Sequence, residues 1–409
     1  MTSRSIALAL SVSVAASACA VEAQEIVVLG VDALLAEGSE HAALLEGKRV
    51  GLITNPSGVD GWLAPTADRL ARDQRWQLVQ LYGPEHGIRG DAAAGDRVGD
   101  EVDALTGVRV ESLYGERRAP SAETLAGVDV VVFDIQDIGS RTYTYVSTLG
   151  EAMKACAAAR KPLVVLDRPN PIGGTRFEGA VIEEQWKSFI GWAPIPVTHG
   201  MTVGEIARYY DEQLELGCDL IVVPMRGWKR EMVWEDTRLE WTTTSPHIPH
   251  ALQAHLYVAT GMVAASTKNV SDAVGSPMPF EAIGGEFIDG AALAGALAAL
   301  DLPGVRFQAT AYKPFYGKFK DKPLRGARLV LDNPRSFRPL HTALSILVTL
   351  RQMYPEQLEL GDQAAIGKHW GTARVLEQLR AGASVADVER SWSSDLSKFE
   401  KARARVLIY

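Results

Sequence analysis

Short apolar runs alternate with longer amphipathic segments along the first half of the chain. Continuous apolar runs of roughly four to eight residues are typical of strands buried on both faces, whereas longer segments with a helical period are typical of helices. Their alternation predicts βαβ units and a parallel sheet. The predicted strands are 49–54, 77–82, 128–135, 162–167 and 219–225, and the predicted helices are 64–73, 144–160 and 202–216.

The pattern changes after Trp228. The aromatic stretch 234–249 contains proline and histidine without a regular period, which predicts a link or lid between two domains. A strand pattern at 327–331 and a helix pattern at 340–353 follow it. We therefore expect an α/β N-terminal domain, residues 24–255, and a second α/β domain, residues 256–409.

The first two dozen residues have the pattern of a secretory signal. Arg4 precedes the apolar run 6–18, and Val21-Glu22-Ala23 offers a cleavage site before Gln24. A buried first strand or helix is the less favoured interpretation, because the run has neither strand alternation nor a cap. Cleavage as a lipoprotein at Cys19 is a minority alternative. We expect residues 1–23 to be a signal peptide and the protein to be periplasmic or extracellular.

Composition narrows the classes of partner. The chain has 409 residues, of which 47% are hydrophobic, enough for two cores. It carries 42 Lys and Arg against 50 Asp and Glu, a formal charge of −8, which argues against a nucleic-acid partner. The leader is too short for a transmembrane segment, which takes roughly 20 apolar residues. The sequence does not indicate an oligomeric state.

Neither the cysteines nor the histidines follow a metal-binding pattern. Beyond the leader only Cys156 and Cys218 remain, with no zinc or redox spacing, and we favour two buried thiols over a disulfide. No glutamate and histidine stand at ligand spacing. We expect neither a metal nor another cofactor.

Polar residues cluster where three predicted strands end. Segments 83–90, 134–137 and 167–171 each follow or close a strand. Open parallel sheets bind ligands beyond the carboxyl ends of their strands, so we expect one crevice to collect all three segments.

The segment 83–90, Gly-Pro-Glu-His-Gly-Ile-Arg-Gly, places Glu85, His86 and Arg89 in one glycine-rich turn. Glycines let backbone and ligand approach closely, and a glutamate in a cleft can serve as a general acid. The alternative is a Glu85–Arg89 pair that stabilises the turn. The chemistry of these residues does not decide between a general acid and a structural ion pair.

The second cluster combines acids, an amide and aromatic rings, the mixture that sugar sites use. Its candidates are Asp134, Gln136, Asp137, Arg141 and Tyr143. An aspartate at a strand end also caps helices, and a tyrosine can simply belong to the core. We favour a functional role for Asp137 and Arg141 and leave Tyr143 open.

The third cluster is a loop stiffened by prolines, in which Arg168 and Asn170 are available for a carboxylate or amide on a ligand. Its alternative is an Asp167–Arg168 pair that holds the turn. His199 stands just before a predicted helix N-terminus, a place that attracts anions, although a lone histidine is more often a structural donor.

Together these segments resemble the exo-β-N-acetylmuramidase family called NamZ. The resemblance spans nearly the whole chain after the leader. The matching segments are 51–58, 83–90, 132–141, 166–174, 199–202 and 224–228.

The resemblance implies a Rossmann-like N-terminal domain with a smaller C-terminal α/β domain. It also implies release of terminal N-acetylmuramic acid (MurNAc) from the non-reducing ends of peptidoglycan fragments, with Glu85 as the leading catalytic candidate. MurNAc carries both a carboxylate and an amide, which suits Arg168 and Asn170. Glycosidases commonly use two carboxylates, and Asp137 is our candidate for the second.

The C-terminal half departs from the family pattern at 266–276. Asn269 matches and remains a candidate substrate ligand, but Ser266 and Val274 replace an expected glutamate and arginine, and Asp272 is shorter than the expected glutamate. Met278 also stands where an arginine is expected. A binding protein that has lost turnover is therefore the second hypothesis. A nucleotide-dependent oxidoreductase is disfavoured, because the first strand is followed by 55–58, Asn-Pro-Ser-Gly, rather than G-x-G-x-x-G.

Overall fold

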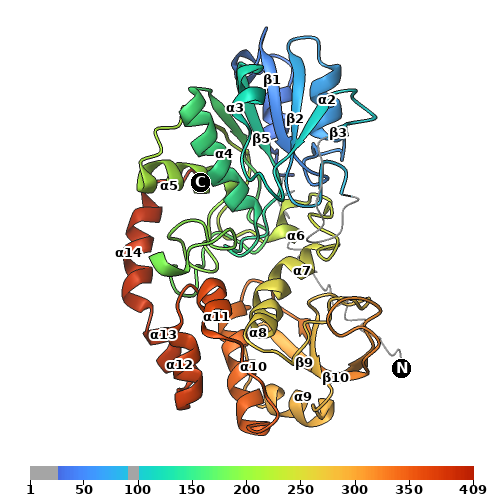
Figure 1. Ribbon diagram of the computed structural model, residues 1–409, viewed down its shortest axis with the longest axis vertical. Coiled ribbons are helices and arrows are strands. Elements are labelled where there is room, and N and C mark those ends of the chain that lie inside the picture. The colour runs from blue at the N-terminus through green and yellow to red at the C-terminus, as the bar shows by residue number, and fades with distance from the viewer. Residues whose placement is uncertain (1–25, 91–100) are drawn as a thin grey trace, which may run out of the picture.

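The computed structural model describes residues 26–90 and 101–409 and shows two α/β domains stacked along the long axis of the molecule (Figure 1). The expected signal segment 1–23, with Cys19, lies outside the described residues. Within them, no helix is both long and apolar enough to cross a membrane. Cys156 and Cys218 are free and buried, which confirms the preference for two thiols.

The N-terminal domain is built on a seven-stranded sheet with the order β3-β4-β2-β1-β5-β6-β7. All neighbouring strands are parallel except β3 and β4, so the mostly parallel, Rossmann-like sheet is confirmed. The chain runs outward from β1 to β2 and β4, then returns to place β5 on the other side of β1. The strands are β1 (Arg49–Thr54), β2 (Gln77–Gly83), β3 (Glu101–Val102), β4 (Arg109–Ser112), β5 (Val130–Asp134), β6 (Leu163–Leu166) and β7 (Leu220–Val223).

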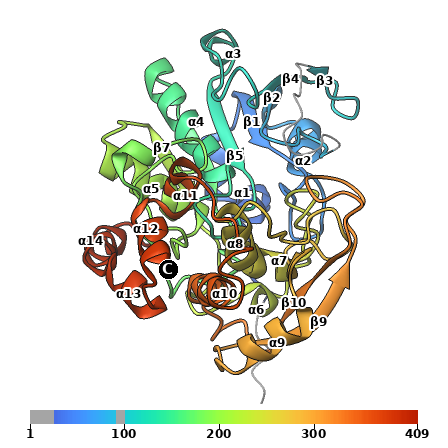
Figure 2. The same ribbon diagram turned by 60° about the horizontal axis from the view of Figure 1, so that its bottom comes forward.

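Alternate residues of the central strands enter two different cores. Val130 and Val132 of β5 pack into one core with α1 and α2, whereas Val131 and Phe133 pack into the other with α3, α4 and α5. The helices therefore lie on opposite faces of the sheet (Figure 2). These are α1 (Gly30–Leu35), α2 (Thr66–Arg72), α3 (Ala122–Ala126), α4 (Tyr145–Ala159) and α5 (Val203–Leu214), with a short 3₁₀ helix at Glu40–Leu44.

The linking stretch 234–249 contains one short helix, α6 (Trp234–Thr237), and is otherwise irregular. It leads into α7 (Ala251–Leu256), the π-helical turn η3 (Tyr257–Gly261) and α8 (Met262–Ala265). The C-terminal domain then forms an antiparallel sheet of order β8-β10-β9. Its elements are β8 (Ala282–Gly285), α9 (Gly290–Ala298), β9 (Val305–Tyr312), β10 (Leu324–Leu331) and α10 (Pro339–Met353).

The last helices bring the chain back to the N-terminal domain. α14 runs along the side of the molecule toward α5, and the C-terminus lies beside α5 (Figure 1). The Tyr409 hydroxyl donates to Asp167 Oδ2 at 2.8 Å, at the end of β6. These helices are α11 (Gln363–Trp370), α12 (Arg374–Ala381), α13 (Val385–Arg390) and α14 (Ser393–Ala404).

Candidate functional site

Glu85 stands in the turn that follows β2. His86 and Gly87 have left-handed backbone, with φ of 73° each, which turns the chain sharply after the strand. The Thr144 hydroxyl donates to Glu85 Oε2 at 2.9 Å, and the Tyr114 side chain also forms a hydrogen bond with Glu85. Burial, followed by this bond, raises the pKa of Tyr114 to about 12. Glu85 is held in place yet remains partly exposed.

Tyr257 brings the C-terminal domain to the same place. Its hydroxyl lies 3.2 Å from Thr142 Oγ1 and donates to Thr142 O at 3.3 Å. Burial raises the pKa of Tyr257 to about 12, and the carboxylates of Glu85, Asp272 and Asp137 add to the effect. Tyr257 of the C-terminal domain is therefore bonded to Thr142, two residues before Thr144, the residue that binds Glu85.

Electrostatic effects and one stacked, hydrogen-bonded pair also connect Asp272 with His86 in the turn that contains Glu85. The Asp272 carboxylate contributes to raising the pKa of Tyr316. The Tyr316 ring stacks on His247 with centroids 5.6 Å apart and planes 19° apart, and the two side chains share a hydrogen bond. His86 in turn lowers the pKa of His247, after the larger effect of burial.

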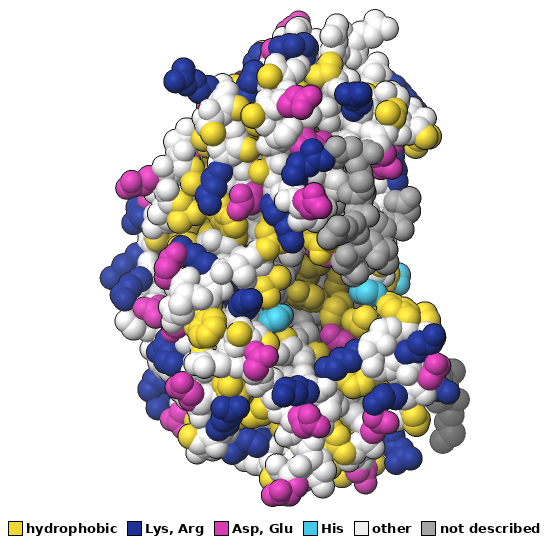
Figure 3. Space-filling model, viewed as in Figure 1, with side chains coloured by type: hydrophobic (Ala, Val, Ile, Leu, Met, Phe, Trp, Pro, Cys, Tyr) yellow, Lys and Arg dark blue, Asp and Glu magenta, His cyan; other side chains and the backbone are white. Residues whose placement is uncertain are grey.

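Hydrogen bonds, stacking and electrostatic effects thus connect Glu85 with side chains of both domains, and we call the connected residues Glu85, Tyr257, Asp272, Tyr316, His247 and His86 the ring. They come from the turn after β2, η3, the segment between α8 and β8, the loop after β9 and the interdomain link. Figure 3 shows a hollow between the two domains, floored by hydrophobic side chains and edged by histidine side chains. We call this hollow the interdomain cleft.

Asp134 and Arg168 form a buried ion pair instead of lining this cleft. Arg168 Nε lies 2.6 Å from Asp134 Oδ1, and their side chains are 2% and 0% exposed. Arg168 also donates to Val59 O at 2.6 Å. Both side chains therefore have partners within the protein, and Arg168 also lines a small pocket beside Ser57 and Val59.

Gln136 and Asn170 likewise bind backbone. Gln136 Nε2 donates to Asp137 O and Pro169 O, each at 2.7 Å. Asn170 Nδ2 donates to Met201 O at 3.0 Å. The three polar segments do meet at the carboxyl edge of the sheet, but most of their side chains are used to join one loop to another.

Asp137 and His199 lie together in the interior of the N-terminal domain. Asp137 Oδ2 accepts from Gly139 N at 2.7 Å and lies 3.3 Å from His199 Nε2. His199 Nδ1 accepts from Met201 N at 3.2 Å, so the ring is fixed at its other nitrogen. Asp137 is 4% exposed and His199 is fully buried.

Arg141 joins the two domains from the inside. It donates to Ala180 O and Ile195 O, at 3.0 and 2.9 Å, and to His369 O of α11 at 2.6 Å. Complete burial lowers the pKa of Arg141 to about 9. Tyr143, also buried, donates to Thr244 Oγ1 at 2.8 Å.

Arg89 points away from Glu85. It pairs with Asp103 and Asp68, each at 2.8 Å, so a Glu85–Arg89 pair is not formed. Arg89 lines a separate cavity of about 460 Å³ at the carboxyl end of β1, together with Asn55 and Trp241.

Two residues of the divergent segment bind other parts of the C-terminal domain. Asn269 donates to Gln357 O at 2.7 Å and accepts from Glu359 N at 3.1 Å. Ser266 is fully buried and accepts from Trp370 Nε1 at 2.7 Å. At the position of the expected glutamate this chain therefore has a buried hydroxyl bonded to Trp370.

Several members of the ring and their partners belong to no sequence motif. No recognised pattern contains Tyr114, Thr144 or Tyr257. Asp272 stands out in the sequence only because the family pattern has a glutamate at this position. His247 lies in the stretch 234–249, which the sequence predicts to be a link or lid, and this is the sequence feature that points to it.

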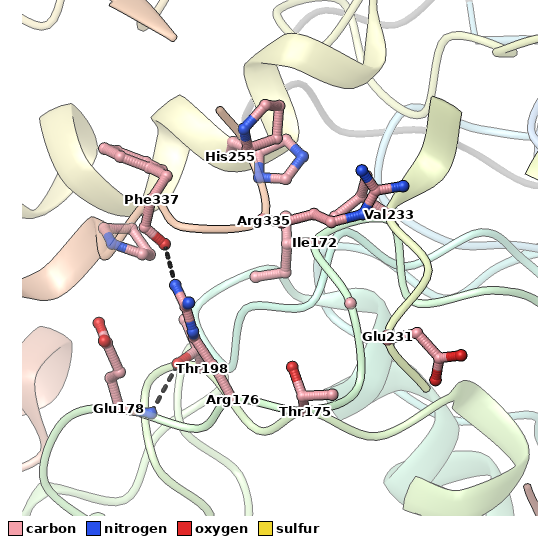
Figure 4. A pocket seen from close by; sticks show the side chains of 13 residues that line it. Ile172, Thr175, Arg176, Glu178, Thr198, Glu231, Val233, His255, Arg335 and Phe337 are labelled. Atoms are coloured by element: carbon pink, nitrogen blue, oxygen red, sulfur yellow. Dashed lines mark hydrogen bonds between the residues drawn. The ribbon is translucent and has the colours of Figure 1, made fainter. Parts of the chain in front are cut away.

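A further cavity, of about 220 Å³, lies between the domains and shares no lining residue with the ring. Arg176 donates to Phe337 O across it, and His255 faces it with an unpartnered Nε2 (Figure 4). Burial lowers the pKa of His255 to about 4, so the imidazole is neutral at physiological pH. Over residues 26–90 and 101–409, no group of three histidine, cysteine or acidic side chains is arranged to hold a metal ion.

The comparisons with known proteins agree with this architecture. Models of the N- and C-terminal domains of the exo-β-N-acetylmuramidase NamZ match residues 50–252 and 255–409. The chain is 40% identical over 380 residues to the peptidoglycan β-N-acetylmuramidase NamZ of Bacillus subtilis, covering 93% of this chain and 91% of that protein.

Two solved DUF1343 family proteins of Bacteroides fragilis have a similar structure. The first is 36% identical with a TM-score of 0.86, covering 94% of this chain and 99% of that one. The second is 23% identical with a TM-score of 0.74 and the same coverage, and supports the fold alone. With both domains matched and 40% identity over nearly its full length, this chain belongs to the NamZ family of exo-β-N-acetylmuramidases.

Proposed function

We propose that this protein is a glycoside hydrolase that releases terminal MurNAc from peptidoglycan fragments, with Glu85 as the general acid. The observation that carries the proposal is the position of Glu85, partly exposed beside the Tyr257–Thr142 contact between the domains and oriented by Thr144 and Tyr114. The family and its Bacillus subtilis member supply the substrate class.

A general acid fits this geometry. In glycoside hydrolysis the acid gives its proton to the leaving oxygen while the bond to the anomeric carbon breaks. The Thr144 hydroxyl fixes one carboxyl oxygen of Glu85. A carboxyl group held in one orientation delivers its proton along one direction, which favours a single bond of a bound sugar.

The rest of the cleft offers surfaces suited to an anionic sugar. Phe315 and Tyr316 are 60% and 38% exposed, and their rings present apolar faces on which a sugar can stack. Arg118 lies over the Tyr114 ring, 4.9 Å from its centroid, and Lys318 is an electrostatic neighbour of Asp272. Either cation suits the lactyl carboxylate of MurNAc.

The alternative is a sugar-binding protein without turnover, suggested by the changed segment 266–276. One observation weighs against it: Ser266, which replaces the expected glutamate, is fully buried and bonded to Trp370, so the change at this position is one of the interior of the C-terminal domain.

Product analysis separates the two functions. Purified protein is incubated with muropeptide fragments that carry MurNAc at the non-reducing end, and the products are resolved by mass spectrometry. A hydrolase yields free MurNAc and a fragment shortened by one residue. Saturable binding with no new product over many hours would establish the alternative.

We also propose that the protein is exported and that its mature form begins near Gln24. The support is the leader pattern of residues 1–23 and a substrate class found outside the cytoplasm. Mass spectrometry of protein recovered from the periplasm or medium is expected to show the cleaved N-terminus. An intact Met1 form confined to the cytosol would refute export.

A further inference from the structure

The cavity of about 220 Å³ between the domains has walls from both domains and from the link that joins them. Ile172 and Arg176 come from the loop after β6, Glu231 precedes α6, His255 belongs to α7, and Phe337 lies between β10 and α10 (Figure 4). None of these residues belongs to the ring. The cavity is therefore separate from the proposed catalytic site.

The size of the cavity limits its occupant. At roughly 30 Å³ for each molecule of liquid water, its volume of about 220 Å³ corresponds to about seven water molecules. Pockets for drug-sized ligands begin at roughly 300 Å³. The cavity therefore suits a molecule of about the size of one amino acid and is too small for an oligosaccharide.

Among the described residues, four charged side chains line the cavity, and two of them are already paired. Glu178 accepts from Arg338 at 2.9 Å, and Arg335 forms an ion pair with Asp236. These two side chains hold the wall together and are satisfied without a ligand.

The other two charged side chains have opposite signs and no ion-pair partner among the side chains that the structure describes. Arg176 donates to Phe337 O at 2.9 Å and pairs with no carboxylate, and Glu231 pairs with no cation. Both are exposed, so a molecule that enters the cavity can reach them. A guanidinium binds a carboxylate and a carboxylate binds an ammonium group. A simple anion or a simple cation would leave one of the two unpaired.

His255 supplies a third group without a partner. Its side chain is 2% exposed, and its Nε2 has no hydrogen-bond partner in the described part of the chain. Leaving a buried polar atom without a partner is unfavourable, and such atoms are rare in folded proteins. A neutral imidazole with its proton on Nε2 can donate one hydrogen bond to a ligand oxygen.

We propose that this cavity is a binding site for a small zwitterion, an α-amino acid with an aliphatic side chain. Arg176 binds the carboxylate, which also accepts from His255 Nε2, and Glu231 binds the ammonium group. The aliphatic side chain lies against the apolar part of the wall, to which Ile172 and Val233 contribute. The site goes beyond the proposed hydrolase function and shares no residue with it.

The first test measures binding of L-leucine and D-leucine to the full chain by calorimetry. Isocaproate, which lacks the ammonium group, and isoamylamine, which lacks the carboxylate, are the comparison compounds. We expect one enantiomer of leucine to bind saturably and each comparison compound to bind at least roughly tenfold more weakly, because each lacks one charge-assisted contact. Equal binding of leucine and isocaproate would refute a site for a zwitterion.

The second test places the ligand in the cavity. Arg176→Met and Glu231→Gln are each expected to weaken leucine binding by roughly 10- to 100-fold. Glu235→Gln is the matched control, because Glu235 is exposed on α6 and does not line the cavity. His255→Leu is expected to weaken binding without lowering the melting temperature of the free protein, because Nε2 has no hydrogen bond to lose.

Three results would overturn the inference. The first is no binding of either enantiomer of leucine at about 10 mM. The second is leucine binding that persists in Arg176→Met and Glu231→Gln, which would place the ligand elsewhere. The third is a crystal structure of the protein with leucine in which water alone lies beside His255 Nε2. Failure to release MurNAc would instead bear on the proposed function, because leucine binding is measured without a saccharide.

Discussion

Asp134 and Arg168 illustrate what most charged side chains at the carboxyl edge of the sheet do. Both are buried and satisfy each other through two bonds, of 2.6 and 2.9 Å. Removing charges from water is unfavourable, and the pair tolerates it only because each partner compensates the other. Such a pair joins the end of β5 to the loop after β6 and shapes the edge on which the cleft is built.

Breaking this pair is expected to be costly. Arg168→Met leaves the Asp134 charge buried without its partner and should lower the free energy of unfolding by roughly 3–5 kcal/mol, measured by urea denaturation. The matched control is Arg49→Met, which removes an exposed ion pair with Asp129 and should change stability little. Equal effects of the two substitutions would show that the buried pair has no special role.

The sequence identified where the polar residues gather but not which of them face solvent. The partner of Arg168 is 34 positions earlier in the chain, and Thr144, which orients Glu85, is 59 positions after it. Tyr257 and Asp272 come from the other domain. A motif shows which chemical groups are present, whereas tertiary packing decides whether a group bonds to the protein or is left for a ligand.

The principal secondary-structure elements followed from the pattern because burial dictates it. β1 occupies the predicted 49–54, since its residues after Arg49 are all buried. The exposed two-residue strand β3 and the four-residue β4 have too few apolar positions to produce a pattern. The helix predicted over 202–216 is α5, Val203–Leu214, with the expected capping box between Thr202 and Glu205.

The cap of α5 also supports the edge of the sheet. Thr202 Oγ1 accepts from Glu205 N at 3.3 Å and donates to Asp167 Oδ2 at 2.8 Å. Thr202→Ala should lower the free energy of unfolding by about 1–2 kcal/mol, at the upper end for a lost cap, because Asp167 also loses a buried donor. Ser384→Ala, which removes the exposed cap of the short helix α13, should have a smaller effect in the same denaturation experiment. A larger loss in Ser384→Ala would contradict this ranking.

At the scale of the whole molecule, the two domains are held as one body around the cleft. Arg141 reaches α11 from within the N-terminal domain, and Tyr409 returns to Asp167 and Met225 from the end of the chain. The family match to both domains agrees with a site that needs both. The proposed activity therefore depends on the assembled chain, because the C-terminal domain contacts the N-terminal domain beside Glu85.

Glu85 is the residue on which the hydrolase assignment depends. Glu85→Gln nearly preserves the shape of the side chain, so the fold and the affinity for a MurNAc substrate should be kept. The lost proton should lower turnover by roughly 10²–10⁴-fold. Arg89→Ala is the control within the same turn, because Arg89 pairs with Asp103 and Asp68 and not with Glu85.

The decisive measurement is turnover and calorimetric binding of one MurNAc-containing disaccharide by the wild type, Glu85→Gln and Arg89→Ala. We expect Glu85→Gln to bind the disaccharide but hardly cleave it, and Arg89→Ala to lose stability while each folded molecule remains active. A Glu85→Gln protein that cleaves at the wild-type rate would contradict the assignment of Glu85 as the general acid.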